Sequence, residues 1–265
     1  MRTLARAPPR LAYTLYAALA FSAMGFSALL AALILPGMRR RRAAARALAR
    51  AFLSLAGMPL TVRGLEKLVP GQCVVVANHA SYLDGLVFTA ALPARFSFVI
   101  KREMSAVPLV GLFLRRIGAE FVERFDRNRG AADARRVLRN AASGHSLVFF
   151  PEGTFTRTPG LLKFHTGAFV TAARAGCPVI PAVVRGTRSA LSPSGALPRP
   201  GRIEVDILAA LHAPPQTEEA SSAALRDRAR EAILRALGEP DLTCSDDNAL
   251  PPHKERGKSV QGSRP

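Results

Sequence analysis

The feature that most constrains this chain is a long apolar stretch near its start, residues 11–35, which carries no charged side chain. A helix needs roughly 20 predominantly apolar residues to cross a bilayer, so the stretch predicts a transmembrane helix. It exceeds the ~7 to 15 residue core of a signal peptide and lacks a small-residue cleavage site. A buried helix of a soluble protein is the alternative, and a half-inserted helix also stays open because hydropathy does not separate it from a full span.

Arginines flank this stretch unequally. Those after it are Arg39, Arg40, Arg41, Arg42, Arg46 and Arg50, against Arg2, Arg6 and Arg10 before it. The positive-inside tendency places the C-terminal side in the cytoplasm, and we expect the membrane to be an inner membrane of bacterial type. Arginines alternate with Ala, Leu and Phe over residues 39–55, which predicts a basic amphipathic helix on anionic headgroups, with Phe52 and Leu53 inserted. An ordinary solvated basic helix is the alternative.

Charge and cysteine content narrow the classes of partner. The net charge of +18 favours a polyanion, which could be nucleic acid, an anionic membrane or a phosphorylated substrate. The cysteines, Cys73, Cys177 and Cys244, lack the spacing of a zinc site or a disulfide framework. We therefore expect reduced thiols and no metal.

Beyond residue 58 short β-rich runs alternate with amphipathic stretches, the pattern of an α/β domain. The predicted strands are 73–77, 96–101, 120–123, 146–150, 178–184 and 202–208. Helices are predicted at 129–142, after Gly167, and at 218–237, where Thr217 is the N-cap and Gly238 and Pro240 end the helix.

The predicted fold is therefore α/β, with a mixed central sheet flanked by helices that follows an N-terminal membrane helix and a basic amphipathic helix. Residues 1–58 are expected to form the membrane anchor and interfacial helix, and 59–238 the main domain. Residues 239–265 are polar and rich in Pro and Ser, which predicts a disordered tail.

Two motifs follow predicted strands. His79 comes directly after the run CVVVA, with Asp84 five residues on. The two side chains can meet if His79 lies in the turn and Asp84 in the first turn of the next helix, and such an aspartate orients a histidine that acts as a general base. In the second motif, FFPEGTFTR at 149–157, Pro151 and Gly153 predict a turn that presents N–H groups to an anion. Taken singly, each motif also fits a structural role.

Together these motifs resemble those of the 1-acylglycerol-3-phosphate acyltransferase family, which has Asn-His, an Asp five residues after the His, and Phe-Pro-Glu-Gly-Thr. The resemblance covers roughly residues 59–210. Further matching segments are Lys101-Arg102-Glu103-Met104 with Pro108 and Gly111, GAEFVER at 118–124, and Pro178-Val179-Ile180-Pro181.

The resemblance implies direct transfer of an acyl group from acyl-CoA or acyl carrier protein to a lysophospholipid hydroxyl, without a cofactor. His79 is then the base and Asp84 its orienting partner. The substrate-binding residues implied for the acceptor are Asn78, Arg124, Glu152, Gly153, Thr154 and Arg157. Arg157 is included because Phe155 stands where many family members carry arginine, and Arg157 or Lys163 can reach the phosphate instead.

Other functions stay open on sequence alone. The acceptor could be another lysophospholipid or a lyso-ornithine lipid, since Phe155 departs from the family pattern. A non-catalytic basic membrane scaffold is a different class, but it leaves His79, Asp84 and Glu152 without a purpose. Nucleic-acid binding accounts for the arginines only, so no nucleic-acid partner is expected.

Overall fold

The computed structural model describes residues 7–123, 133, 136–141, 144–192, 197–214 and 217–243. Its helices are α1 (Ala7–Ile34), α2 (Met38–Leu55), α3 (Asp84–Ala91), α4 (Val110–Arg116), α6 (Gly167–Arg174), α7 (Thr187–Ala190) and α8 (Glu218–Leu237), with 3-10 turns η1 (Leu65–Lys67) and η2 (Arg102–Ala106). Its strands are β1 (Leu60–Arg63), β2 (Val74–Ala77), β3 (Phe96–Lys101), β4 (Glu120–Val122), β5 (Ser146–Phe149), β6 (Val179–Arg185) and β7 (Ile203–Ile207).

The strands form one sheet in the order β1-β7-β6-β2-β5-β3-β4. All neighbours are parallel except β6 and β7, which are antiparallel, so the predicted mixed sheet is confirmed. Every strand predicted from the sequence is present, and β1 is an additional strand at the sheet edge. Strand β2 lies at the centre with all four residues buried, as expected of a strand covered on both faces.

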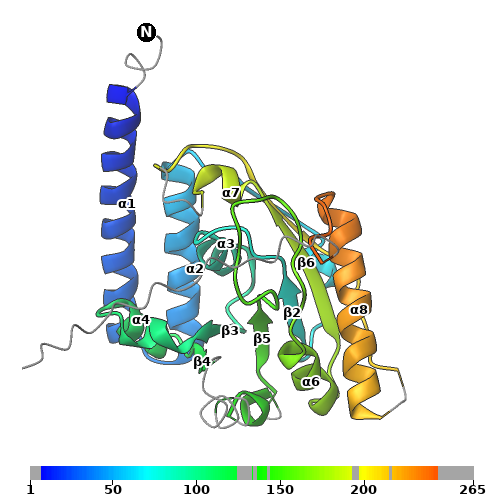
Figure 1. Cartoon of the computed structure of the whole chain (residues 1–265). Helices are drawn as coiled ribbons and strands as arrows, with labels where there is room; N and C mark the ends of the chain where they lie inside the picture. Colours follow the sequence, from blue (N-terminus) through cyan, green and yellow to red (C-terminus); the bar gives the residue numbers. More distant parts are fainter. Residues whose placement is uncertain are drawn as a thin grey trace, which may run out of the picture.

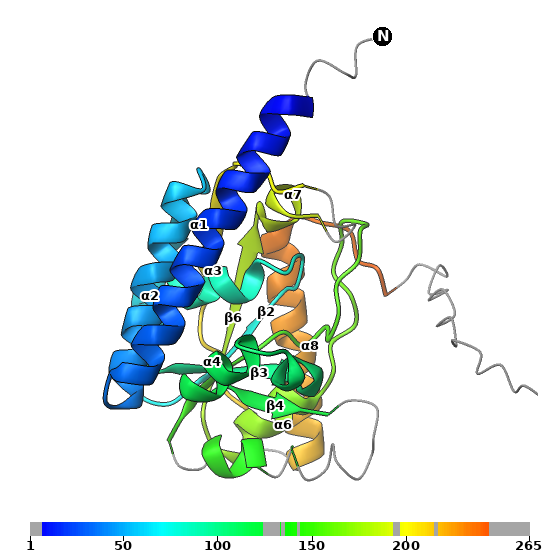
Figure 2. The ribbon, with the colours of Figure 1, turned by 90° about the vertical axis from the view of Figure 1, so that its left-hand side faces the viewer.

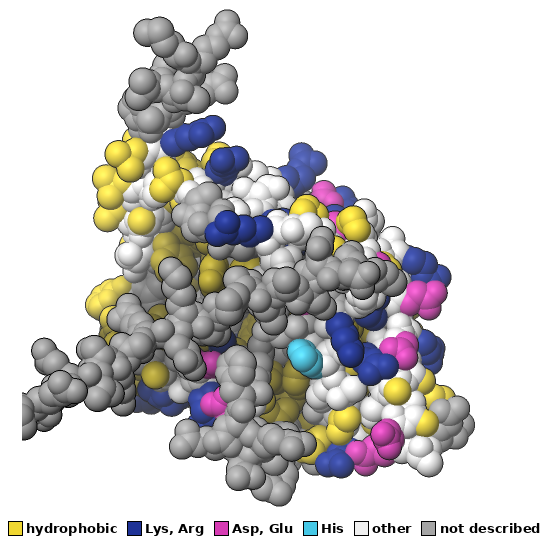
Figure 3. Space-filling view, viewed as in Figure 1, with side chains coloured by type: hydrophobic (Ala, Val, Ile, Leu, Met, Phe, Trp, Pro, Cys, Tyr) yellow, Lys and Arg dark blue, Asp and Glu magenta, His cyan; other side chains and the backbone are white. Residues whose placement is uncertain are grey.

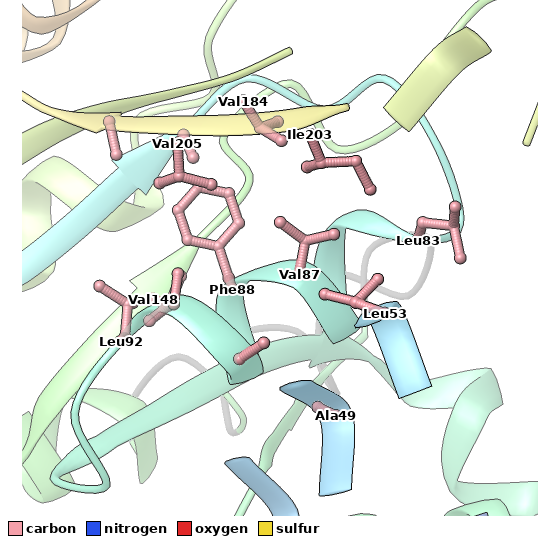
Figure 4. Packing of buried hydrophobic residues seen from close by; sticks show 14 of the residues in the cluster. Ala49, Leu53, Leu83, Val87, Phe88, Leu92, Val148, Val184, Ile203 and Val205 are labelled. Atoms are coloured by element: carbon pink, nitrogen blue, oxygen red, sulfur yellow. The ribbon is translucent and has the colours of Figure 1, made fainter. Parts of the chain in front are cut away.

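Helices cover both faces of the sheet (Figure 1). On one face α2 and α3 bury a cluster that includes Leu53, Val87 and Phe88 against the strands (Figure 4). On the other face α6 and α8 bury Phe169, Leu225 and other apolar side chains. Helix α8 has the predicted bounds, with Thr217 accepting from the Ala220 N–H and Gly238 in the left-handed conformation at its end.

Helix α2 corrects one expectation. Phe52 and Leu53, predicted to insert into the bilayer, are 5% and 1% exposed and belong to the protein core. Part of its arginine content is structural too, because Arg42 donates to the carbonyls of Ile117 and Arg95, and Arg50 donates to that of Ala90. A stripe of apolar residues beside arginines can either bind a membrane surface or pack into a protein core. In α2 this stripe packs into the core of the domain.

Helix α1 lies antiparallel to α2 (Figures 1 and 2). The Tyr13 and Tyr16 hydroxyls donate to the carbonyls of Ala56 and Leu55, at 2.8 and 3.0 Å, which ties the start of α1 to the end of α2. Residues Arg10–Ile34 are long and apolar enough to cross a membrane, and only 17% of the most apolar window is buried. Hydrophobic side chains therefore remain exposed along α1 (Figure 3).

Two other expectations need comment. Residues 239–243, assigned to the disordered tail, contact the domain: Glu239 accepts from the Gly160 N–H, and Asp241 forms an ion pair with Arg230. The rest of that tail, including Cys244, lies outside the described residues. Of the helix expected at 129–142, Asp133 and residues 136–141 are described and are helical. The division into anchor, domain and tail stays a prediction.

Candidate active site

His79 and Asp84 meet at the carboxyl end of the central strand β2. His79 lies in the turn after the strand, and Asp84 is the first residue of α3. The His79 Nδ1 and Asp84 Oδ2 atoms are 2.7 Å apart, which is the arrangement expected from the spacing. The same oxygen accepts from the backbone N–H groups of Ala80 and Ser81, at 2.7 and 2.9 Å. Asp84 therefore fixes both the turn and the ring.

This hydrogen bond determines which nitrogen of His79 can react. Asp84 is fully buried, while 20% of the His79 side chain is exposed. With Nδ1–H donating to the carboxylate, Nε2 carries the lone pair and is available to accept a proton. The negative charge of Asp84 also stabilises the imidazolium that proton transfer creates. Geometry and charge therefore suit His79 to general-base catalysis.

Aromatic rings surround His79. The Phe150 ring stacks on it, with centroids 4.6 Å apart, and the Phe155 ring meets it edge to face at 4.5 Å. Tyr82, which is 72% exposed, makes an edge contact with Phe155 at 4.8 Å. The sequence showed Phe155 as a departure from the family pattern, but its contact with the histidine was not predictable from spacing. These rings hold His79 in an apolar setting with one edge open.

Glu152, predicted to bind substrate, has both of its side-chain oxygens engaged within the protein. Its side chain is buried, and its two oxygens accept from the backbone N–H groups of His79 at 2.6 Å and Leu162 at 2.9 Å. Burial raises the pKa of the Glu152 carboxyl to about 7, opposed by these two hydrogen bonds and by the charge of Arg188. Glu152 is thus a positioning residue that holds the catalytic turn against the Phe-Pro-Glu-Gly-Thr turn.

Asn78, also predicted to bind substrate, has its side-chain amide engaged within the protein. It is 2% exposed, its amide group donates to the Val184 carbonyl at 3.0 Å, and its side-chain oxygen accepts from the Val184 N–H at 2.8 Å. The carboxamide thereby continues the pairing of β2 with β6 for one residue beyond the ladder. Asn78 positions the backbone on which His79 stands.

The turn predicted after β5 is present. Gly153 has a φ of 74°, which favours glycine, and its N–H donates to the Phe150 carbonyl. Thr154 and Arg157 are exposed, so both remain available to a ligand. Among the described residues, no hydrogen bond or ion pair of the Arg157 side chain is found.

Arg188 is a site residue that sequence reasoning missed. It lies in α7, just past the carboxyl end of β6, and donates to the carbonyls of Thr156 and Thr158 at 2.7 and 2.9 Å. It also forms an ion pair with Glu239 at 3.1 Å. Arg188 thus fixes the loop that carries Arg157. The rule that sites form at the carboxyl ends of parallel strands could have indicated it.

Arg124 lies outside the described residues. The residue before it is held in place, because the Glu123 N–H donates to the Asp133 carboxylate at 2.9 Å. Asp133 is buried and also forms ion pairs with Arg102 and Arg136. In the described part of the chain no group of three His, Cys, Asp or Glu side chains could hold a metal ion.

Known acyltransferases resemble this chain in sequence. An acyltransferase family model matches residues 59–185. The chain is 31% identical over 211 residues to a Caenorhabditis elegans protein provisionally named 1-acyl-sn-glycerol-3-phosphate acyltransferase acl-2, a match covering 78% of this chain and 73% of that one. Human lysophospholipid acyltransferase LPCAT4 is 30% identical over 220 residues, covering 76% of this chain but 40% of the human protein.

The fold has also been seen experimentally. The crystal structure of the 1-acyl-sn-glycerophosphate (LPA) acyltransferase PlsC from Thermotoga maritima superposes with a TM-score of 0.70 at 22% identity, covering 86% of this chain and 94% of that one. The motifs, the α/β fold and the C. elegans relative agree. The chain belongs to the family of 1-acylglycerol-3-phosphate and lysophospholipid acyltransferases, and it is an acyltransferase.

Proposed function

We propose that this enzyme transfers a fatty acyl group from acyl-CoA or acyl carrier protein to the free hydroxyl of 1-acylglycerol 3-phosphate, giving phosphatidic acid. The observation that carries the proposal is the His79–Asp84 pair, with Nδ1 engaged at 2.7 Å and Nε2 left for substrate. Relatives that carry the name of this activity support the choice of acceptor.

The reaction needs no acyl-enzyme. His79 Nε2 removes the proton of the acceptor hydroxyl while its oxygen attacks the thioester carbonyl carbon. The tetrahedral intermediate then expels the thiolate, which takes the proton back from the imidazolium. A positioned base of this kind contributes ~10²- to 10⁴-fold in rate. The phenylalanine rings cover part of His79 and limit the access of water, which favours transfer to the lipid hydroxyl over hydrolysis of the thioester.

We further propose that the acceptor phosphate binds where the loop after Gly153 exposes Thr154 and Arg157, together with Arg124. Arginine suits this role because its planar fork can make two hydrogen bonds to phosphate oxygens. Behind this surface Glu152 holds the two turns together, and Asn78 ties the turn that carries His79 to β6. Arg157 thus serves in place of the arginine that Phe155 replaces.

The membrane part of the proposal rests on α1. Its exposed apolar residues include Leu15, Leu19, Phe26 and Ile34, which are 62%, 63%, 68% and 69% exposed. Burial in lipid would remove this surface from water, so we place α1 in the membrane. The excess of arginines after the apolar stretch favours the cytoplasmic side for the catalytic domain. Lysophospholipid then reaches the active site from the bilayer, and the donor reaches it from the cytoplasm.

The test is acyl transfer by purified protein in detergent micelles, with acyl-CoA and a panel of lysolipids. Highest kcat/KM with 1-acylglycerol 3-phosphate supports the proposal, whereas a preference for lysophosphatidylcholine, lysophosphatidylethanolamine or a lyso-ornithine lipid moves the acceptor to the second candidate. Phe155 favours that candidate, because it stands beside His79 where many family members carry the positive charge of an arginine. No transfer to any lysolipid would indicate a non-catalytic scaffold.

Arg157→Ala probes the acceptor site directly. We expect it to raise the KM for the lysolipid by ~10- to 150-fold while that for acyl-CoA changes less than twofold, because a hydrogen bond to a charged group contributes ~1.5–3 kcal/mol. Arg174→Ala, on the far end of α6 and paired with Glu218 at the surface, is the matched control. Equal increases in both KM values would contradict the assigned contact.

A further inference from the structure

A second apolar surface stands apart from α1. Residues 106–110, Ala-Val-Pro-Leu-Val, are all exposed and carry no charge. Val107 and Val110 are each 40% exposed, and Leu109 is 65% exposed. We call this segment the 106–110 turn. A run of five exposed apolar residues is unusual on a soluble surface and marks an interaction site.

The backbone holds this turn in a strained form. Leu109 has φ 60° and is the only described residue other than glycine with a positive φ. The Val110 N–H donates to the Pro108 carbonyl at 2.6 Å, which closes a three-residue turn of the rare γ type around Leu109. Such strain persists only where neighbouring structure enforces it, and it is typical of functional sites.

Neighbouring contacts enforce the strain from both sides. The Gly111 N–H donates to the Val107 carbonyl at 2.8 Å. A Cβ at Gly111 would lie 2.3 Å from the Ser105 carbonyl oxygen, so that residue must be glycine. Arg115 donates to the same Ser105 carbonyl. The protein thus fixes a leucine in an unfavourable backbone conformation and leaves its side chain outside the core. Packing of that side chain within the chain does not offset the strain.

The turn adjoins the membrane helix. It leads into α4, which contacts α1 and lies beside the lower half of that helix in both ribbon views (Figures 1 and 2). Arg41 and Arg42, at the start of α2, donate to the carbonyls of Arg116 and Ile117 and fix α4 there. At this end of α1, Ile34 is 69% exposed. The helix that begins at the turn is therefore held against α1.

Charged groups around the turn suit a lipid surface. The side chains of Lys101, Arg115 and Arg116 are exposed near it, against one exposed carboxylate, Glu103, and the chain as a whole carries +18. Apolar side chains flanked by basic ones bind an anionic bilayer by inserting the former and pairing the latter with headgroups. A protein partner would fit the apolar residues alone, but continuity with α1 and the basic border favour lipid.

We propose that the 106–110 turn is a second membrane contact, in which Leu109 inserts into an anionic phospholipid bilayer beside α1. This inference rests on the membrane association proposed above for α1. Two separate contacts would fix the tilt of the domain on the membrane, so that the β3–β4 side of the sheet faces the bilayer from which the lysolipid arrives.

The test uses the full chain with one fluorescent label at a time, reconstituted on vesicles of phosphatidylglycerol and phosphatidylethanolamine. Nitrobenzoxadiazole is attached to Leu109→Cys, to Phe26→Cys on α1, or to Leu197→Cys, each in a Cys244→Ser background. Cys73 and Cys177 are buried and do not label. Leu197, 45% exposed on a loop beyond α7, is the matched apolar control. Quenching by nitroxide lipids reports contact with acyl chains.

We expect quenching of the labels at positions 26 and 109 to exceed that at 197 by about threefold or more, as for groups that enter the acyl boundary. Quenching at 26 but not at 109 would overturn the inference and leave the membrane association of α1 intact. A label at 109 that is shielded from water but not quenched would mean that protein covers the turn, which also overturns it. Acyl transfer by the same proteins in detergent micelles reports the proposed catalytic function separately.

Discussion

Replacing Asp84 by asparagine should separate catalysis from folding. Asparagine can place its oxygen where Oδ2 now accepts from the N–H groups of Ala80 and Ser81, so the turn is kept. It removes the negative charge that stabilises the His79 imidazolium. In the Ser-His-Asp enzymes the equivalent change lowers kcat by ~10⁴-fold. Since a general base contributes ~10²- to 10⁴-fold, we expect kcat to fall by that factor, or about 2.7–5.4 kcal/mol in the barrier.

The cost in stability should be small by comparison. Asp84 Oδ1 is buried and, among the described residues, has no hydrogen-bond partner. An amide NH2 group there lacks a partner, which costs ~1–3 kcal/mol for that one group, but the change removes the larger penalty of a buried charge. The Tm should therefore shift by a few degrees only. Asp84→Ala is the contrasting variant: it removes the same charge but also leaves the backbone N–H groups of Ala80 and Ser81 without an acceptor, which costs ~2–6 kcal/mol for the two groups.

The assay is release of CoA thiol at saturating lysolipid, with thermal unfolding in the same detergent. The double variant His79→Ala/Asp84→Asn should be about as slow as His79→Ala alone, because the two residues act as one unit. A folded Asp84→Asn protein with kcat within about tenfold of the wild type would refute the reasoning, since the carboxylate would then add no more than ~1.4 kcal/mol.

Two further predictions concern stability. The folded pKa of Glu152, about 7, lies above its ordinary value of 4.5, so its contribution is fully present below pH 4.5 and is lost as pH rises through 7. In the wild type this shift should lower the free energy of unfolding by roughly 3 kcal/mol between pH 4.5 and 7, measured by unfolding at several pH values. Glu152→Gln should make the free energy of unfolding nearly independent of pH over that window. An unchanged pH dependence would show that other groups cause it. Leu53→Ala should lower the free energy of unfolding by ~2–5 kcal/mol, whereas Leu55→Ala, at a 54% exposed position on the same helix, should change it little. Equally small effects of the two variants would mean that Leu53 contacts the bilayer and not the protein core.

Local patterns in the sequence predicted the parts of the fold that depend on local structure. The bounds of α8 follow from Thr217, Gly238 and the spacing of its apolar residues. The contact between His79 and Asp84 also follows, because a strand end and the first turn of a helix separate the two by one short loop. Strand β1 was missed because it has four residues and is half exposed, too short for its alternation to be distinctive.

The roles of other site residues depend on partners far along the chain. Asn78 and Glu152 were taken as substrate-binding because they lie in the motifs, yet their partners, Val184 and Leu162, are fixed only by the tertiary fold. Leu53 shows the same limit, since an apolar stripe has one pattern whether it meets lipid or protein. Spacing thus indicated which segments form the site, whereas contacts distant in the sequence determine which of their side chains are engaged within the protein.

The central claim is that His79 is the base that activates the acceptor hydroxyl. The most direct measurement is the kcat of His79→Ala for acyl transfer to 1-acylglycerol 3-phosphate, with folding checked by circular dichroism and lysolipid binding by equilibrium titration. We predict a loss of at least ~10²-fold, with binding and fold nearly unchanged, because the residue acts on a proton in the transition state. A folded His79→Ala protein with wild-type kcat would contradict the mechanism.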